Sequence, residues 1–227
     1  LLTLNMVRNG LFGEVLHAEG AYNHDLSKEY LFNKNGYADM WRLKENIGKF
    51  GNLYPTHGLG PIAQCMNINR GDKMDHLVSM VTNDFTLGAL AKESAAKDPF
   101  FNEYAGKKYR GNMSNTLVRT TNGKSLLIQH DVSSPRPYSR IHLISGTKGA
   151  AQKWPGPEHI ALGQKKKKKE ELDELYKKYS PPIVNHIGTI AKEVGGHGGM
   201  DFIMDWRLID CLRNGLPLDQ DVYDAAA

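Results

Sequence analysis

One short segment, residues 51–61, places a tyrosine and a histidine three positions apart between glycines. It reads GNLYPTHGLGP, so Tyr54 and His57 stand where a helix is expected to begin. A histidine there feels the positive end of the helix dipole, which favours a neutral ring that can accept a proton. The flanking glycines would let a ligand approach the backbone. The segment therefore indicates proton-transfer chemistry; the structural alternative is a histidine that caps the turn beside a core tyrosine.

Three further groups combine polar and aromatic side chains. Residues 22–25, Tyr-Asn-His-Asp, stand where a strand runs into a long loop, and residues 41–42 set an indole beside a guanidinium, which suits a sugar or a carboxylate. In residues 133–138, SSPRPY, two prolines hold the last tyrosine rigidly. Taken singly, each group is also typical of a packing anchor. The glycine-rich residues 195–199 lack the Walker lysine and the dinucleotide fingerprint, so we expect a flexible wall of a site or a plain loop.

The composition excludes several classes of protein. The chain has 227 residues, of which 40% are apolar and 24% charged, as in ordinary globular proteins, and no run approaches the ~20 apolar residues of a membrane span. The net charge is +4, but residues 165–169 alone supply five lysines, which we expect to form a solvated loop leading into a helix, so no nucleic acid partner is indicated. Cys65 and Cys211 resemble small apolar helix residues, and the histidines lack metal-site spacing, so no metal is expected.

The strands expected from the sequence all lie in the first two thirds of the chain, and the last third is expected to be helical. Strands are expected at residues 14–22, 76–82, 115–121, 124–130 and 140–145. Helices are expected at residues 58–69, 170–179, 183–194 and 201–214. Pro61 suits the first turn of its helix, and the pair Asn122-Gly123 suits a type I′ hairpin turn. The three strands after residue 114 would follow one another as an antiparallel meander, while residues 23–53 show no regular pattern.

Strands first and helices afterwards are typical of an α+β architecture. We expect an open, mainly antiparallel sheet with helices packed on one face. The first helix, which ends at Gly10, lacks its beginning, and residues 221–227 read as a helix start with nothing after it. Residues 1–227 are therefore expected to be a single domain that is truncated at both ends.

Six segments together resemble one family of enzymes. In chain order they are GEVLHAEGAY, Trp41-Arg42, GNLYPTHGLGPIAQ, SSPRPYSR, SGTKGA and GGHGGMDF. The sequence resembles glycoside hydrolase family 109, the NAD-dependent α-N-acetylgalactosaminidase branch of the glucose–fructose oxidoreductase and inositol dehydrogenase (Gfo/Idh/MocA-like) superfamily. The resemblance implies that NAD is held mostly by an upstream Rossmann domain, which is missing here. This chain would be the C-terminal domain, which supplies most of the sugar pocket.

The resemblance also implies a set of site residues. The side chains that would contact the carbohydrate are Tyr22, Arg42, Tyr54, Pro55, Thr56, His57 and Tyr138. The catalytic residues would be His57, Tyr54 and Tyr22, which move protons while NAD oxidises C3 of the sugar, the aglycone is eliminated, water adds and the ketone is reduced. A tyrosine is a poor base near neutral pH, and we expect Arg42 to lower the pKa of one of these phenols.

Two other functions remain open at this stage. A sugar or cyclitol dehydrogenase of the same superfamily would need the same histidine and tyrosines but no leaving group. The chain by itself could instead be an inactive binding or oligomerisation module, and we expect a homo-oligomer formed through the sheet face. The resemblance suggests an exported or periplasmic bacterial protein, although no residue shows the compartment.

Overall fold

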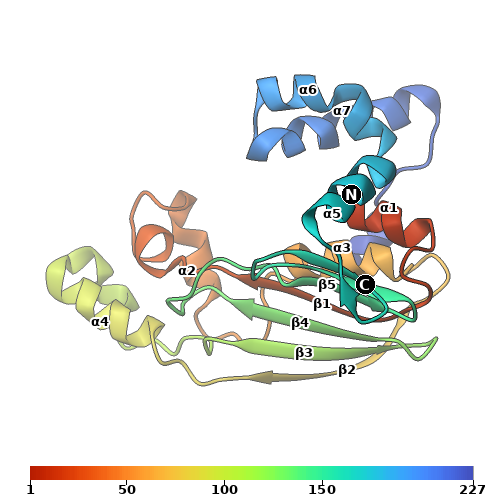
Figure 1. The fold of residues 1–227 in the computed structure, drawn as a ribbon. Helices are drawn as coiled ribbons and strands as arrows, with labels where there is room; N and C mark the ends of the chain where they lie inside the picture. Colours follow the sequence, from red (N-terminus) through yellow and green to blue (C-terminus); the bar gives the residue numbers. More distant parts are fainter. Residues whose placement is uncertain (227) are drawn as a thin grey trace.

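The computed structural model describes residues 1–226, which form one eight-stranded sheet with helices on one of its faces (Figure 1). The strand order is β2-β3-β4-β1-β5-β6-β7-β8. Every neighbouring pair is antiparallel except β1 and β4. The strands are β1 (Val15–Asn23), β2 (Met74–Val81), β3 (Ser114–Thr120), β4 (Ser125–Asp131), β5 (His142–Gly146), β6 (Gly149–Lys153), β7 (His159–Leu162) and β8 (Lys165–Lys166). The expected α+β class and the mainly antiparallel sheet are confirmed.

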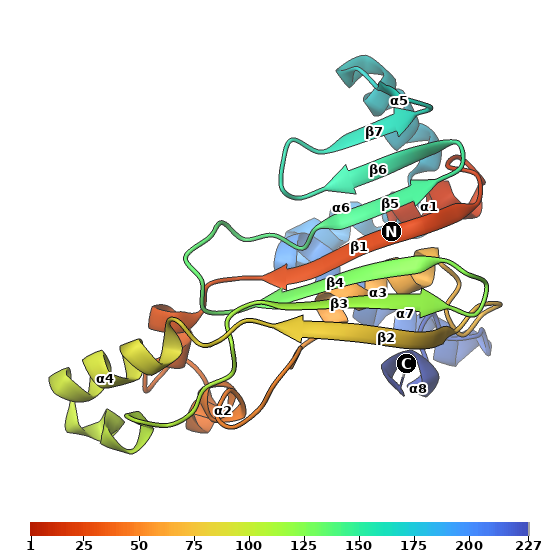
Figure 2. The ribbon, with the colours of Figure 1, turned by 90° about the horizontal axis from the view of Figure 1, so that it is seen from below.

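The order of the central strands differs from the expected meander. β5 does not pair with the β3–β4 hairpin, because β1 lies between β4 and β5 (Figure 2). β1 runs parallel to β4, with Tyr22 opposite His130, and antiparallel to β5. The chain after β4 must therefore cross the end of β1 before it re-enters the sheet. This crossing places the loop that carries Tyr138 beside the end of β1.

The hairpin between β3 and β4 has a different turn from the expected type I′. Gly123 has a φ of +80°, but Asn122 is not among the residues with positive φ. Gly123 N donates to Thr120 O at 2.9 Å, and Thr120 N donates to Lys124 O at 2.9 Å, which makes a three-residue loop with one left-handed residue. The cause is Asp72, whose carboxylate accepts hydrogen bonds from the Asn122 amide and two threonine hydroxyls.

The helices α1 (Leu2–Arg8), α3 (Thr56–Cys65) and α5 (Lys169–Tyr179) pack on one face of the sheet, as expected, whereas α6 (Pro182–Val194) and α7 (Met200–Asn214) form a pair further out on the same side (Figure 1). The helices α2 (Trp41–Glu45) and α4 (Leu87–Lys97) lie at one end of the sheet, and α8 (Val222–Ala226) follows α7. Residues 23–53, expected to be irregular, hold α2 and two further helical turns, Ser27–Leu31 and Ala38–Met40. Within residues 1–226, no helix is long and apolar enough to cross a bilayer.

Two predicted boundaries are wrong. The helix expected over residues 58–69 runs from Thr56 to Cys65, so Pro61 lies inside it rather than in its first turn. Its apolar face is as predicted, because Ile62 and Cys65 are buried. In the lysine run, Lys165 and Lys166 form the exposed edge strand β8 instead of a loop, and α5 begins at Lys169.

A contact between two glycines sets the distance between α3 and β1. A Cβ atom at Gly58 would lie 2.7 Å from the backbone N of Ala21, and a Cβ atom at Gly20 would collide with the carbonyl of Gly58. Only glycines allow this approach of helix backbone to strand backbone. Gly58 therefore serves packing, not ligand access as expected, and it brings His57 close to the end of β1.

Candidate active site

Three of the predicted site residues meet where α3 begins over the end of β1. The Tyr22 ring lies edge-on to the Tyr54 ring, with centroids 5.4 Å apart, and edge-on to His57 at 4.8 Å. Tyr54 and His57 are 4.9 Å apart. Tyr22 is only 8% exposed, so it forms the floor on which the other two rings rest. The contact arises because β1 and α3 touch at Gly20, two residues before Tyr22, and at Gly58, one residue after His57.

Tyr138 and His24 complete this group from the other side. The Tyr138 ring lies 6.3 Å from Tyr22 and 4.9 Å from His24. Tyr22 Oη and His24 Nδ1 are 3.2 Å apart, within hydrogen-bond distance. Tyr22, His24, Tyr54, His57 and Tyr138 are hereafter called the aromatic cluster. His24 belongs to the polar and aromatic group at residues 22–25, but only Tyr22 of that group was expected to contact the sugar; the spacing of two at a strand end could have indicated that both side chains share a face.

Arg42 joins the aromatic cluster from α2. Its guanidinium lies 4.9 Å from the Tyr54 ring centroid and 4.8 Å from that of Tyr37, and its Nη1 donates to Tyr37 Oη at 2.9 Å. Stacking on aromatic faces holds the planar guanidinium in place. Pro55 and Thr56 are exposed at the start of α3 and stand between Tyr54 and His57 in the sequence. The structure thus brings all seven predicted site residues to one end of the sheet.

Both histidines of the aromatic cluster favour the neutral form. Burial lowers the pKa of His57, and the positive charges of Arg140 and Arg42 lower it further. Burial also lowers the pKa of His24, with Arg42 acting in the same direction. Each ring therefore has a free lone pair at neutral pH and can accept a proton. The neutral His57 agrees with the sequence-based expectation, but its main cause is burial.

Tyr22 differs from the expectation. Burial raises the pKa of its phenol, and the nearby Arg42, which acts in the opposite direction, does not cancel that effect. The expectation that Arg42 makes this tyrosine more acidic than usual is therefore wrong in its net direction. A phenol of this kind can relay a proton only if a second group accepts it, and His24 is the group within reach.

Arg110 is buried behind the site and was missed by the sequence analysis. It is 0% exposed, and its guanidinium donates to Asn46 Oδ1 at 3.1 Å, Gly51 O at 3.1 Å and Asn112 O at 3.3 Å. Asn46 ends α2, which carries Arg42, and Gly51 precedes the Tyr54 loop. Arg110 therefore fixes two site-bearing segments to each other.

His130 lies beside Tyr22, on the neighbouring strand β4. Their rings are stacked with centroids 6.2 Å apart, and His130 is 1% exposed. Neither of its ring nitrogens has a hydrogen-bond partner, nor does the hydroxyl of its cross-strand neighbour Ser114. Burial lowers the pKa of His130 to about 3, so the ring is neutral. It supports the Tyr22 ring without adding charge.

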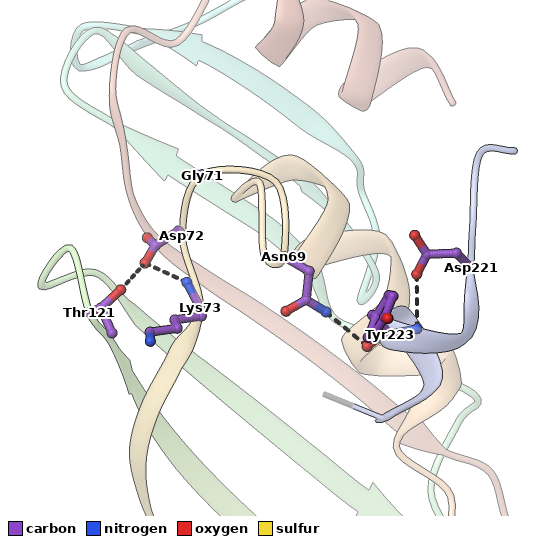
Figure 3. Close-up of a pocket in the computed structure, with 7 residues that line it drawn as sticks. All are labelled: Asn69, Gly71, Asp72, Lys73, Thr121, Asp221 and Tyr223. Atoms are coloured by element: carbon purple, nitrogen blue, oxygen red, sulfur yellow. Dashed lines mark hydrogen bonds between the residues drawn. The ribbon is translucent and has the colours of Figure 1, made fainter. Parts of the chain in front are cut away.

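One hollow and one sequence motif elsewhere in the described chain are explained by internal contacts. The hollow between residues 69–73, Thr121 and α8 lies near the β3–β4 turn, and Figure 3 shows that its polar groups bond to one another. In residues 195–199, side chains at Gly196 and Gly199 would meet Asp201 and Ala191, so these glycines are explained by packing. Among residues 1–226, no group of three or more histidine, cysteine or acidic side chains could hold a metal ion.

A family model and the curated relatives match the whole chain and indicate the same family. The family model for the glycosyl hydrolase 109 C-terminal domain matches residues 1–227. A glycosyl hydrolase family 109 protein of Solibacter usitatus is 47% identical over 228 residues, which cover 100% of this chain and 51% of that protein. A protein of Shewanella oneidensis named alpha-N-acetylgalactosaminidase is 45% identical over 234 residues, covering 100% of this chain and 50% of that protein. The chain thus spans about half the length of the curated relatives it matches.

Solved structures show a more distant likeness. A levoglucosan dehydrogenase in complex with NADH and levoglucosan aligns with a TM-score of 0.48 and 16% identity, covering 71% of this chain and 39% of that one. An inositol dehydrogenase homolog from Azotobacter vinelandii, complexed with NAD+, aligns with a TM-score of 0.47 and 14% identity, covering 71% and 40%.

Proposed function

The chain belongs to glycosyl hydrolase family 109, and from this membership we propose that the protein containing it hydrolyses terminal α-linked N-acetylgalactosamine with the help of NAD. This chain would supply the side chains that bind and deprotonate the sugar. The dinucleotide would be held by the part of the relatives that has no counterpart in these residues. The main support is the aromatic cluster, in which two neutral histidines and three phenols meet around the end of β1.

The chemistry of the aromatic cluster favours oxidation and elimination over ordinary glycoside hydrolysis. Most glycosidases place two carboxyl groups on either side of the scissile bond. The side chains of the aromatic cluster and Arg42 include no carboxylate; they are proton acceptors, phenols and a cation. This set fits NAD because removal of hydride from a carbon also requires a base for the proton of its hydroxyl group. When bound, NAD would take hydride from C3 of the sugar and later return it.

We assign His57 to the proton of the C3 hydroxyl. Its imidazole is neutral and partly exposed, and Tyr54, 4.9 Å away between ring centroids, would help to orient that hydroxyl. Arg42, held on the Tyr54 ring, would donate hydrogen bonds to sugar oxygens. Replacing Arg42 with leucine should weaken sugar binding because both the donors and the stacked plane are lost.

Tyr22 and His24 are assigned to the C2 proton. A carbonyl at C3 makes the C2 proton acidic. Once that proton is removed, the C1–O bond breaks and the aglycone leaves with a proton from solvent; water then adds at C1 while a proton returns to C2. Tyr22 would take the C2 proton while it passes its own to His24, which lies 3.2 Å from the phenol oxygen. The partly exposed His24 would then exchange with solvent. Such a relay does not need a tyrosine with a low pKa, in agreement with the raised pKa of Tyr22.

The decisive experiment uses the full-length protein. We expect release of N-acetylgalactosamine from an α-linked substrate, loss of release when NAD is stripped, and recovery when NAD is added back. The His57→Ala variant should fold and lose activity, because the C3 hydroxyl no longer has a base. Stoichiometric accumulation of NADH from free sugar without glycoside cleavage would instead identify a dehydrogenase, and full activity of NAD-free enzyme would refute the proposed mechanism.

A further inference from the structure

A second aromatic surface continues outward from the aromatic cluster. The Trp154 ring lies edge-on to the Tyr138 ring, with centroids 6.1 Å apart, and Tyr138 in turn lies 6.3 Å from Tyr22. Tyr138 precedes β5 and Trp154 follows β6; the pairing of His142 with Lys153 brings both loops to the same end of the sheet. His57, Tyr22, Tyr138 and Trp154 therefore form one continuous row, of which the proposed chemistry uses only the first part.

The backbone at Trp154 is in an unusual conformation. Its φ is +53°, in the left-handed region that bulky side chains rarely adopt. Residues held in such conformations often lie at active sites and ligand-binding positions. The ring is only partly buried, so packing in a core does not explain the conformation. The strained backbone directs the indole towards Tyr138.

Two cations accompany this surface. Lys153 Nζ lies 4.9 Å from the Trp154 ring centroid, and the Arg140 guanidinium lies 5.7 Å from the Tyr138 ring centroid and donates to its hydroxyl group. Both side chains provide N–H donors beside an aromatic face. A pyranose ring needs this combination, because its C–H groups form an apolar face and its hydroxyl oxygens accept hydrogen bonds.

We propose that Trp154 forms a second subsite, next to Tyr138 at the edge of the first, which binds the sugar residue to which the terminal N-acetylgalactosamine is attached. The inference rests on the proposed function, because the row starts at the residues assigned to the reacting sugar. The substrate is therefore a chain in which N-acetylgalactosamine is linked to a second sugar. The apolar face of this second sugar is buried on the Trp154 indole, while Lys153 and Arg140 donate hydrogen bonds to its hydroxyl groups.

The kinetic test compares two substrates in the full-length protein. One is N-acetylgalactosamine α-linked to galactose, and the other is its α-methyl glycoside, which has no second ring. In Trp154→Ala the ratio of kcat/KM for the disaccharide to that for the methyl glycoside should fall about tenfold or more, corresponding to about 1.4 kcal/mol of lost stacking. Trp154→Phe should restore most of the ratio. The control Trp206→Phe, on α7 against His186, should leave the ratio at its wild-type value.

A second measurement needs no cofactor and no turnover. In the NAD-free full-length protein, titration calorimetry compares binding of the disaccharide with binding of N-acetylgalactosamine, in the wild type and in Trp154→Ala. The wild type should bind the disaccharide about tenfold or more tightly than N-acetylgalactosamine, and Trp154→Ala should lose this preference. If the full-length wild-type protein cleaves neither substrate, the proposed function fails while this titration still decides the subsite. Equal losses on both substrates in Trp154→Ala, or no preference for the disaccharide in the wild type, would overturn the subsite.

Discussion

Replacement of Gly58 by alanine tests how the fold positions His57. The new methyl group would lie 2.7 Å from the backbone N of Ala21, where ordinary contact begins near 3.4 Å, so α3 must move away from β1 by several tenths of an ångström. The neighbouring atoms are backbone, which cannot rotate aside. Overpacking of this kind costs roughly 1–3 kcal/mol, partly offset by up to about 1 kcal/mol of gained helix propensity. We expect a net loss of about 1–2 kcal/mol, or a melting temperature lower by about 2–8 °C.

Gly60 provides a matched control two residues further along the same helix. A Cβ atom there meets nothing within 4 Å, and its φ is not positive, so Gly60→Ala should be neutral or stabilise by up to about 1 kcal/mol. Urea unfolding of both variants measures the difference. In the full-length protein, Gly58→Ala should also lose activity at temperatures where it is fully folded, because the His57–Tyr22 distance grows. Equal stability and equal activity of the two variants would refute the role of the glycine contact.

Three further predictions concern buried and exposed groups elsewhere in the fold. Arg110→Met should lower the free energy of unfolding by about 3 kcal/mol or more, measured by urea titration, because three buried oxygen acceptors lose their donor. A loss below about 1 kcal/mol would contradict the role of Arg110 in holding Asn46 and Gly51 together. The pKa of His130 falls from 6.5 to about 3 on folding, so the stability it contributes is complete above pH 6.5 and is lost as the pH falls from there towards 3. From pH 7 to 5 the wild type should therefore lose about 2 kcal/mol more than His130→Leu, and parallel pH curves would contradict this. The uncovered sheet face exposes Val78 and Leu117, which are 60% and 48% accessible. We therefore expect sedimentation to show that the protein self-associates, and the double variant Val78→Lys, Leu117→Lys should be monomeric. A monomeric wild type would contradict self-association through this face.

Local sequence patterns predicted most helices and strands, because these elements depend on residues that are close together in the sequence. The β3–β4 hairpin and the helices over residues 170–179, 183–194 and 201–214 follow from periodicity and from turn residues. The insertion of β1 between β4 and β5 could not be predicted in the same way. It depends on pairing between strands about 110 residues apart, for example His17 with Ser125, and no local signal reports such a pairing.

The same distinction applies to the candidate site. Tyr54 and His57 were identifiable because they stand together at a helix start. Arg110 was not, because an arginine after Lys107 and Lys108 looks like a surface residue until Asn46 and Gly51 are found beside it.

The central claim is that Tyr22, Tyr54, His57 and Tyr138 surround one sugar ring. A crystal structure of the full-length protein soaked with N-acetylgalactosamine tests it most directly. We expect the sugar to contact His57 with its C3 hydroxyl group and to lie within reach of Tyr22 at C2. A sugar bound at another surface, with these four side chains free of ligand, would contradict the assignment.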